Sequence, residues 1–369
     1  MRLGGLVLLF AVLVLMVGCT VPKPTPSPAS PPIPTPTPVP SPTPSSLLPP
    51  PVPSQPAPTP LKPPASISPV PPPSPPTPEP APATTPAPTV DRVIRLYYYG
   101  VPIIGGDPAA AAGPHTIYSA TSSDGIHFQE EPGVRFSYDS GTQFGITDPD
   151  VVRLNDGSWL MFLSLGTQLL KATSPDSSGT FTHDKSFNWN HGGVPGSYNF
   201  GGNVRTFVSY QGGIHVAAYD QTNGTLRYTG VALNPPPSGM IADPSVIEVD
   251  NKFLMFYKYA PSPSAPPSEH EIYLATSADG ITWSQHTQNR FICKGSVPGA
   301  VYYNDAIYIY YCGIPPKPGA PPSDMGVATS TDKGATFTLS TISIRGKVSA
   351  GVVDPAAVVV SLAESTGKP

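Results

Sequence analysis

The apolar residues from about position 91 onward fall into two short patterns that alternate along the chain. In its clearest copies the first pattern has an Asp-Pro start, a β-branched strand, a tight turn and an aromatic strand. It runs over residues 148–163, 243–257 and 297–311, with a weaker copy over 203–219. Asx-Gly and Gly-Gly between apolar runs are typical of β-hairpins, so each copy predicts a hairpin.

The second pattern is a strand, a turn and another strand. Its copies begin at Ile117, Leu169, Leu226, Ile272 and Met325. A unit of this length, repeated five times, is typical of a propeller blade built from four antiparallel strands. The copy over 330–337 resembles the Asp-box of sialidases, in which the Asp caps backbone N–H groups of a turn. We therefore expect the Asp residues of this second pattern to be structural.

The two ends of this region complete each other. A fifth copy of the first pattern begins at Asp354-Pro355 but lacks its aromatic strand. Residues 93–100 have the sequence of such a strand without a preceding partner. Joining them would close a ring and remove two exposed sheet edges. The sequence predicts an all-β fold, a five-bladed β-propeller over 91–369 whose N-terminal strand closes the last blade.

The first nineteen residues resemble an export signal. Arg2 precedes an apolar run over 3–17, which is short for a membrane-spanning helix, and the run ends in Val17-Gly18-Cys19. A small residue before Cys resembles the lipobox of bacterial lipoproteins, which implies acylation at Cys19. This predicts an exported, lipid-anchored protein at the cell membrane or surface. A plain secretory signal with an incidental Cys is the alternative.

Residues 20–90 are unable to form a core, since they hold 32 of the 55 prolines, interleaved with Ser, Thr and Ala. Proline fixes φ and removes a hydrogen-bond donor, so a disordered, polyproline-II-like spacer is expected, with a recognition role for the Pro-rich motifs as the alternative.

The region from 91 onward has a net charge of −6 and no basic patch, which argues against nucleic acid as a partner. We expect a monomer.

The acidic residues that open the first pattern are the main candidates for chemistry. In a propeller, they would lie near the start of the strand closest to the axis. Asp148, Asp243 and Asp354 would then converge at one end of the channel, with Asn203 and Ser296 at the equivalent places. Crowded carboxylates raise one another's pKa, which can create an acid/base pair. The alternative is a strand-entry turn, favoured for Asp354.

Three further residues are candidates for binding a substrate. Arg205 is placed opposite the carboxylates, where it would bind a sugar or neutralise the aspartates. His115 lies just before a strand, and Glu248 lies five residues into an inner strand, either in the cleft or between blades. No cofactor and no Cys/His metal site are expected. Ca²⁺ in the acidic channel is compatible with the sequence but unsupported by it.

These motifs resemble those of the five-bladed propeller glycoside hydrolases, namely family 43 arabinanases and β-xylosidases and, more distantly, invertases and levansucrases. The resemblance implies a carbohydrate partner. It also implies that Asp148, in Thr147–Val151, is the catalytic base and that Asp243 tunes the acid. The general-acid Glu of the family's Glu-Gly-Pro motif is absent, because Ser296-Val297-Pro298 stands at the aligned place.

Two function classes therefore stay open, a glycoside hydrolase and a non-catalytic glycan-binding or structural propeller. Glu248, Glu269 and Glu271 are the nearby alternatives for the acid, although solvated loop charges fit the last two better. Sialidase activity is disfavoured, because it needs an arginine cluster for the substrate carboxylate and the sequence has no early Arg-Ile-Pro motif to supply it. Cys293 and Cys312 bracket one hairpin, which favours a disulfide over two buried thiols.

Overall fold

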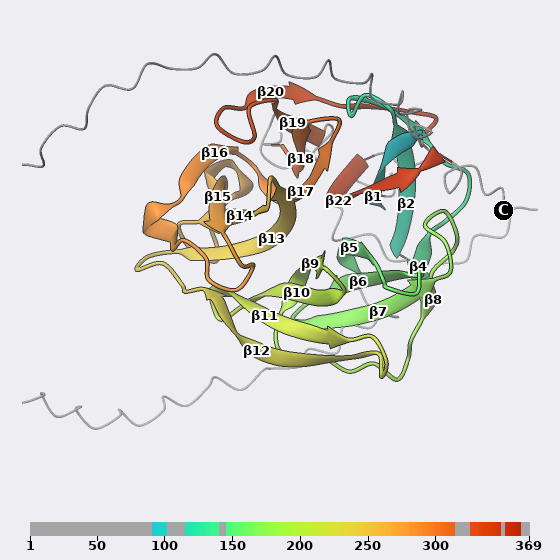
Figure 1. The fold of residues 1–369 in the computed structure, drawn as a ribbon, viewed down its shortest axis with the longest axis horizontal. Coiled ribbons are helices and arrows are strands. Elements are labelled where there is room, and N and C mark those ends of the chain that lie inside the picture. The colour runs from blue at the N-terminus through green and yellow to red at the C-terminus, as the bar shows by residue number, and fades with distance from the viewer. Residues whose placement is uncertain (1–90, 102–114, 140–144, 314–324, 348–350, 363–369) are drawn as a thin grey trace, which may run out of the picture. The chain divides into compact units, whose positions relative to one another are not determined.

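The computed structural model describes residues 91–101, 115–139, 145–313, 325–347 and 351–362 (Figure 1). The predicted signal peptide over 1–19, the predicted linker over 20–90 and the predicted lipidation site at Cys19 lie outside these residues. Within the described ranges, no helix is long and apolar enough to cross a membrane.

The described chain forms five sheets, and a strand near the axis begins each of them (Figure 1). The first four sheets, from the axis outward, are β5(Thr147–Arg153)–β6(Trp159–Leu165)–β7(Gln168–Ser174)–β8(Thr182–His183); β9(Gly193–Phe200)–β10(Asn203–Tyr210)–β11(Gly213–Asp220)–β12(Thr225–Leu233); β13(Met240–Val249)–β14(Lys252–Ala260)–β15(Glu271–Ser277)–β16(Arg290–Lys294); and β17(Ser296–Tyr303)–β18(Ala306–Cys312)–β19(Met325–Ser330)–β20(Thr338–Thr341).

The fifth sheet joins the two ends of the domain. Its order is β22(Gly351–Ser361)–β1(Arg92–Val101)–β2(His115–Ser122)–β3(His127–Glu130)–β21(Ser343–Arg345), and β4(Phe136–Tyr138) also pairs with β2. Every described strand pair of the five sheets is antiparallel except β21 with β3, which is parallel. Strand β1 runs antiparallel to β22, with Leu96 opposite Ala357. The predicted closure by the N-terminal strand is confirmed.

The five inner strands form a closed ring. Strand β5 contacts β9, β9 contacts β13, β13 contacts β17, β17 contacts β22, and β22 contacts β5. The blades bury both faces of their middle strands against each other, which is why every residue of β6 from Trp159 to Ser164 is buried. Phe207 of one blade, for example, packs with Tyr257 and Trp283 of the next. The predicted five-bladed propeller is confirmed.

One backbone motif repeats at the start of every inner strand. A residue with positive φ, between 49° and 55°, stands directly before a proline in all five blades. These left-handed residues are Asp148, Val194, Asp243, Val297 and Asp354. Each lies at a β-bulge or register shift in its sheet. We call the five residue pairs the Xaa-Pro ring, and they set the geometry of one end of the channel.

The Asp residues of the second pattern are structural, as expected. Asp279 Oδ1 accepts hydrogen bonds from the backbone N–H groups of Ile281 and Thr282, at 2.8 and 2.7 Å. The Thr336 hydroxyl donates to Asp332 Oδ2 at 2.6 Å, and the Thr336 N–H donates to Asp332 Oδ1 at 2.8 Å. These bonds hold the pKa of both carboxyls at about 2, so they remain ionised turn caps.

Candidate active site

Three aspartates of the Xaa-Pro ring come together at one end of the channel. The backbone N–H of Asp148 donates to Asp354 Oδ2 at 3.4 Å, although the two residues are 206 positions apart. Asp243 is buried, whereas Asp148 and Asp354 retain some exposed surface. The convergence expected from the sequence is present, and it follows from the ring closure.

A lysine that the sequence analysis missed lies among these carboxyls. Lys258 Nζ is 2.7 Å from Asp243 Oδ2, and both side chains are largely buried. Lys258 belongs to β14, where it pairs with Ala242, one residue before Asp243. In the sequence it interrupts an apolar-aromatic strand over 253–260, and this interruption was the one available signal.

The electrostatics follow from three acids beside one base. Burial and the charge of Asp243 raise the pKa of Asp148 to about 6. Burial and the charge of Asp148 raise the pKa of Asp354 well above its ordinary value. Burial lowers the pKa of Lys258, but the three carboxylates outweigh it and raise the pKa overall. The cluster therefore contains two carboxyls, Asp148 and Asp354, whose pKa values are raised by burial and by the negative charge of neighbouring carboxyls.

Hydroxyl and amide groups orient two of the carboxyls. Thr147 Oγ1 donates to Asp148 Oδ2 at 2.7 Å, and the Ser164 hydroxyl also bonds the Asp148 carboxyl. The backbone N–H of Val297 donates to Asp243 Oδ2 at 3.2 Å. The bonds from Thr147 and Ser164 favour the ionised form of Asp148, against the effect of burial on its pKa.

Cys312 belongs to this site, and the predicted disulfide is wrong. Cys293 and Cys312 are both free and buried. Cys293 lies in β16, the outermost strand of its blade, whereas Cys312 ends β18 in the next blade and pairs with Ser296 instead. The Cys312 sulfur accepts the backbone N–H of Asp354 at 3.3 Å and lies 3.8 Å from its Oδ1.

Among the described residues, Glu269 and Glu271 make no hydrogen bond or ion pair with the carboxyl cluster. Ser296 begins β17, as the aligned motif predicted. Glu271 pairs with Lys294 at 2.9 Å, and Glu269 is exposed in the short 3-10 helix η2(Pro267–Glu269). His270, the residue after η2, does approach the site. Burial is the largest cause of its lowered pKa, and the charge of Lys258 is the second.

His115 is buried next to Tyr99. The Tyr99 ring stacks on the His115 imidazole, with their centroids 5.1 Å apart. Among the described residues, neither ring nitrogen of His115 nor the Tyr99 hydroxyl has a hydrogen-bond partner. Burial and then the charge of Asp354 raise the pKa of Tyr99, which connects this pair to the carboxyl cluster. A substrate contact for His115 stays a prediction.

Arg205 and Asn203 do not lie among the carboxyls, so the predicted placement is wrong for both. They belong to β10, the second strand of its blade, because the inner strand is β9. Asn203 is exposed. Arg205 lies over the Phe200 ring, 4.7 Å from its centroid, and donates to the Gly280 carbonyl at 2.9 Å. The inner strand was missed because Val194-Pro195 lacks the acidic residue of the other copies.

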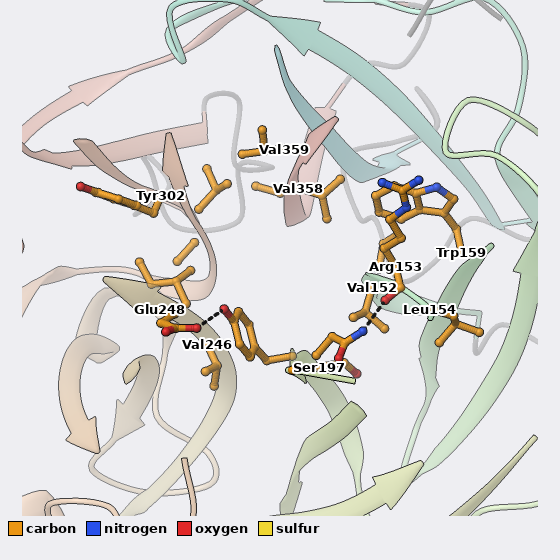
Figure 2. A pocket seen from close by; sticks show the side chains of 18 of the residues that line it. Val152, Arg153, Leu154, Trp159, Ser197, Val246, Glu248, Tyr302, Val358 and Val359 are labelled. Carbon is orange, nitrogen blue, oxygen red and sulfur yellow. Dashed lines mark hydrogen bonds between the residues drawn. The ribbon is translucent and has the colours of Figure 1, made fainter. Parts of the chain in front are cut away.

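Glu248 lies at the opposite end of the channel from the aspartates. It follows Asp243 by five residues in the same strand, which corresponds to roughly 15 Å. Its carboxylate accepts a hydrogen bond from the Tyr198 hydroxyl at 3.0 Å. Both residues line a cavity of about 610 Å³, which Figure 2 shows. Glu248 therefore has no part in the carboxyl cluster.

The carboxyl cluster is not arranged as a metal centre. Within the described ranges, no three His, Cys, Asp or Glu side chains are placed to hold a metal ion together. The ammonium group of Lys258 provides the positive charge beside Asp243 instead. The arrangement is suited to proton transfer between carboxyls of unequal pKa.

No protein-family model and no curated protein matches this sequence. Among solved structures, an endo-1,4-β-xylanase from Bacteroides thetaiotaomicron is 14% identical, over 72% of this chain and 96% of its own, with a TM-score of 0.50. A structure described as a glycoside hydrolase is 12% identical, over 70% of this chain and 61% of its own, also with a TM-score of 0.50. At this level of identity, the likeness shows that the chain shares the five-bladed fold of such hydrolases.

Proposed function

We propose that this domain is a glycoside hydrolase that acts on a polysaccharide or oligosaccharide through an acid/base pair of aspartates. The observation that carries the proposal is the meeting of Asp148, Asp243 and Asp354 around Lys258, with two of the carboxyl pKa values raised. Hydrolysis of a glycosidic bond needs a protonated carboxyl for the leaving oxygen and a carboxylate to activate water.

Each residue of the cluster has a role in this proposal. Asp354, with the more strongly raised pKa, gives its proton to the glycosidic oxygen as the bond from the anomeric carbon to that oxygen breaks. Asp148 takes a proton from the water that attacks the anomeric carbon. Asp243 is paired with Lys258, and its charge contributes, after burial, to the raised pKa of both neighbours. The arrangement would replace the absent Glu of the Glu-Gly-Pro motif.

The test is hydrolysis of aryl-arabinoside, aryl-xyloside and polysaccharide substrates by the wild type and by single variants. We expect Asp148→Asn and Asp354→Asn each to lower kcat/KM by about 10²–10⁴-fold, the usual contribution of an acid or base. Asp332→Asn, which changes a turn carboxylate, is the matched control and should retain activity. Full activity of Asp354→Asn would remove it as the acid.

A non-catalytic glycan-binding propeller is the second candidate. Ser296 favours it, because serine is unable to serve as the general acid at neutral pH. Binding to a glycan panel without any product, in the wild type as well as in Asp148→Asn, would establish this alternative.

We further propose that the chain is exported and anchored by acylation at Cys19. The apolar run over 3–17 and the small residue before Cys19 support this proposal. Labelling with a fatty-acid probe in a bacterial host is expected to mark the wild type and to be lost in Cys19→Ala. Equal labelling of both would contradict lipidation at this position.

A further inference from the structure

The cavity that contains Glu248 is separate from the carboxyl cluster and has its own polar groups. All five inner strands line it, through Val151, Ser197, Val246, Ala300 and Ala357. Its volume of about 610 Å³ lies within the range of ligand-binding pockets, roughly 300–1,000 Å³. We call it the distal cavity, since β13 separates its Glu248 from Asp243 by about 15 Å.

The charged groups of the distal cavity lie on opposite walls. Figure 2 shows Glu248 on one side and Arg153 on the other, with Ser197 between them. The Arg153 guanidinium lies over the Trp159 ring, 5.9 Å from its centroid, and Glu248 is held by the Tyr198 hydroxyl. One acid and one base leave the lining without a dominant charge, which suits an uncharged ligand.

The rest of the lining is apolar or aromatic. Valines 246, 358 and 359 form part of the wall, and the rings of Tyr198 and Tyr302 remain partly exposed beside Glu248. A sugar ring has hydroxyls that both donate and accept, together with C–H faces that pack on aromatic side chains. Acceptors at Glu248, donors at Arg153 and flanking tyrosines match both of these properties.

We propose that the distal cavity is a second glycan-binding site, for an uncharged sugar unit, at the opposite end of the channel from the aspartates. The identity of the ligand rests on the proposed glycan function, but the place of binding does not depend on catalysis. The two ends would then hold different segments of a polymer, so the domain would bind polysaccharide more tightly than a single site allows.

The test is affinity electrophoresis of the full chain in gels that contain arabinan, xylan or mannan. We expect Glu248→Ala and Arg153→Ala each to weaken retention on the bound polysaccharide by about tenfold, the effect of one lost charged hydrogen bond. Both variants should hydrolyse small aryl glycosides at the wild-type rate. Asp250→Asn is the matched control, because it removes an exposed carboxylate two residues away that does not line the cavity.

The outcomes separate the two proposals. Retention that is unchanged in Glu248→Ala and Arg153→Ala overturns the second site, as does retention that is lost in Asp148→Asn alone. Neither result affects the proposed hydrolase. Retention that depends on Glu248, in a protein without hydrolytic activity, supports the second site and overturns the hydrolase. The absence of any retention in the wild type overturns the second site.

Discussion

At the scale of the residue, the candidate acid/base groups are also the strained residues of the Xaa-Pro ring. Asp148, Asp243 and Asp354 have φ near 50°, a conformation that Asp adopts more readily than most residues. Val194 and Val297 adopt it too, and for a β-branched side chain it costs on the order of 1–3 kcal/mol. The propeller backbone therefore imposes the positive φ at all five positions, and Asp adopts it with less strain than Val.

The raised pKa of Asp148 predicts how stability changes with pH. The ordinary value is 3.8 and the folded value about 6, so between these the folded state holds more protons than the unfolded state. Stability should therefore fall as pH rises from about 4 to 6 and stay reduced above it. Asp148→Asn lacks this loss and keeps a residue that tolerates positive φ. The difference between these two pKa values corresponds to roughly 3 kcal/mol, so we expect Asp148→Asn to be more stable than the wild type at pH 7 by up to about 3 kcal/mol.

Urea unfolding of both proteins at pH 4 and pH 7 measures this difference. The advantage of Asp148→Asn should be small at pH 4 and larger at pH 7. A constant difference at both values would mean that the Asp148 carboxyl does not titrate in this range. The same pKa predicts that hydrolysis declines below pH 6, where the proposed base becomes protonated.

At the scale of the element, two inner strands, β9 and β17, need glycine directly after the ring proline. A Cβ on Gly196 would lie 1.8 Å from the Pro244 carbonyl oxygen of the next strand, and one on Gly299 would lie 2.2 Å from the Pro355 oxygen. Both contacts involve backbone, which has little room to move. Gly196→Ala should therefore destabilise the domain by about 3 kcal/mol.

Denaturant unfolding tests this prediction, with Ala356→Gly as the control at the equivalent position of another blade. That change should cost only about 0.5–1 kcal/mol, the ordinary penalty of glycine in a strand. Equal effects of the two substitutions would argue against close packing of the inner strands at this point.

The inner strands also show how far sequence reasoning reached. Four were located from their Xaa-Pro starts, and the closing strand β1 was found because 93–100 lacked a partner. Strand β9 was missed, since Val194-Pro195-Gly196 has neither an acidic residue nor strong β-propensity. That omission shifted Arg205 and Asn203 one strand inward. Lys258 and the exposed setting of Glu248 depend on three-dimensional neighbours, which a linear pattern does not specify.

At the scale of the whole molecule, the ring depends on strands contributed by both ends of the domain. Strand β22 carries Asp354 and is the inner strand of the fifth blade. Strand β1 lies between β22 and β2. A chain that begins at residue 115 would leave the fifth blade without its second strand and expose the apolar faces of its neighbours. We expect this shorter chain to be insoluble or unfolded.

A chain that begins at Asp91 is the comparison and should remain soluble with cooperative thermal unfolding. Circular dichroism and size-exclusion chromatography distinguish the two. A folded, monomeric protein without β1 would show that four blades are sufficient and that closure is not required for stability.

The Xaa-Pro ring has a consequence for how such a site can change over evolutionary time. Five blades present the same left-handed residue toward one end of the axis, and the side chain at that position can be exchanged while the backbone stays fixed. Three of these five positions have aspartate, and two have valine. A single Val→Asp substitution at position 194 or 297 would add another carboxyl at the equivalent place in its blade. The number of carboxyls at this end of the channel can therefore change without a change in the fold.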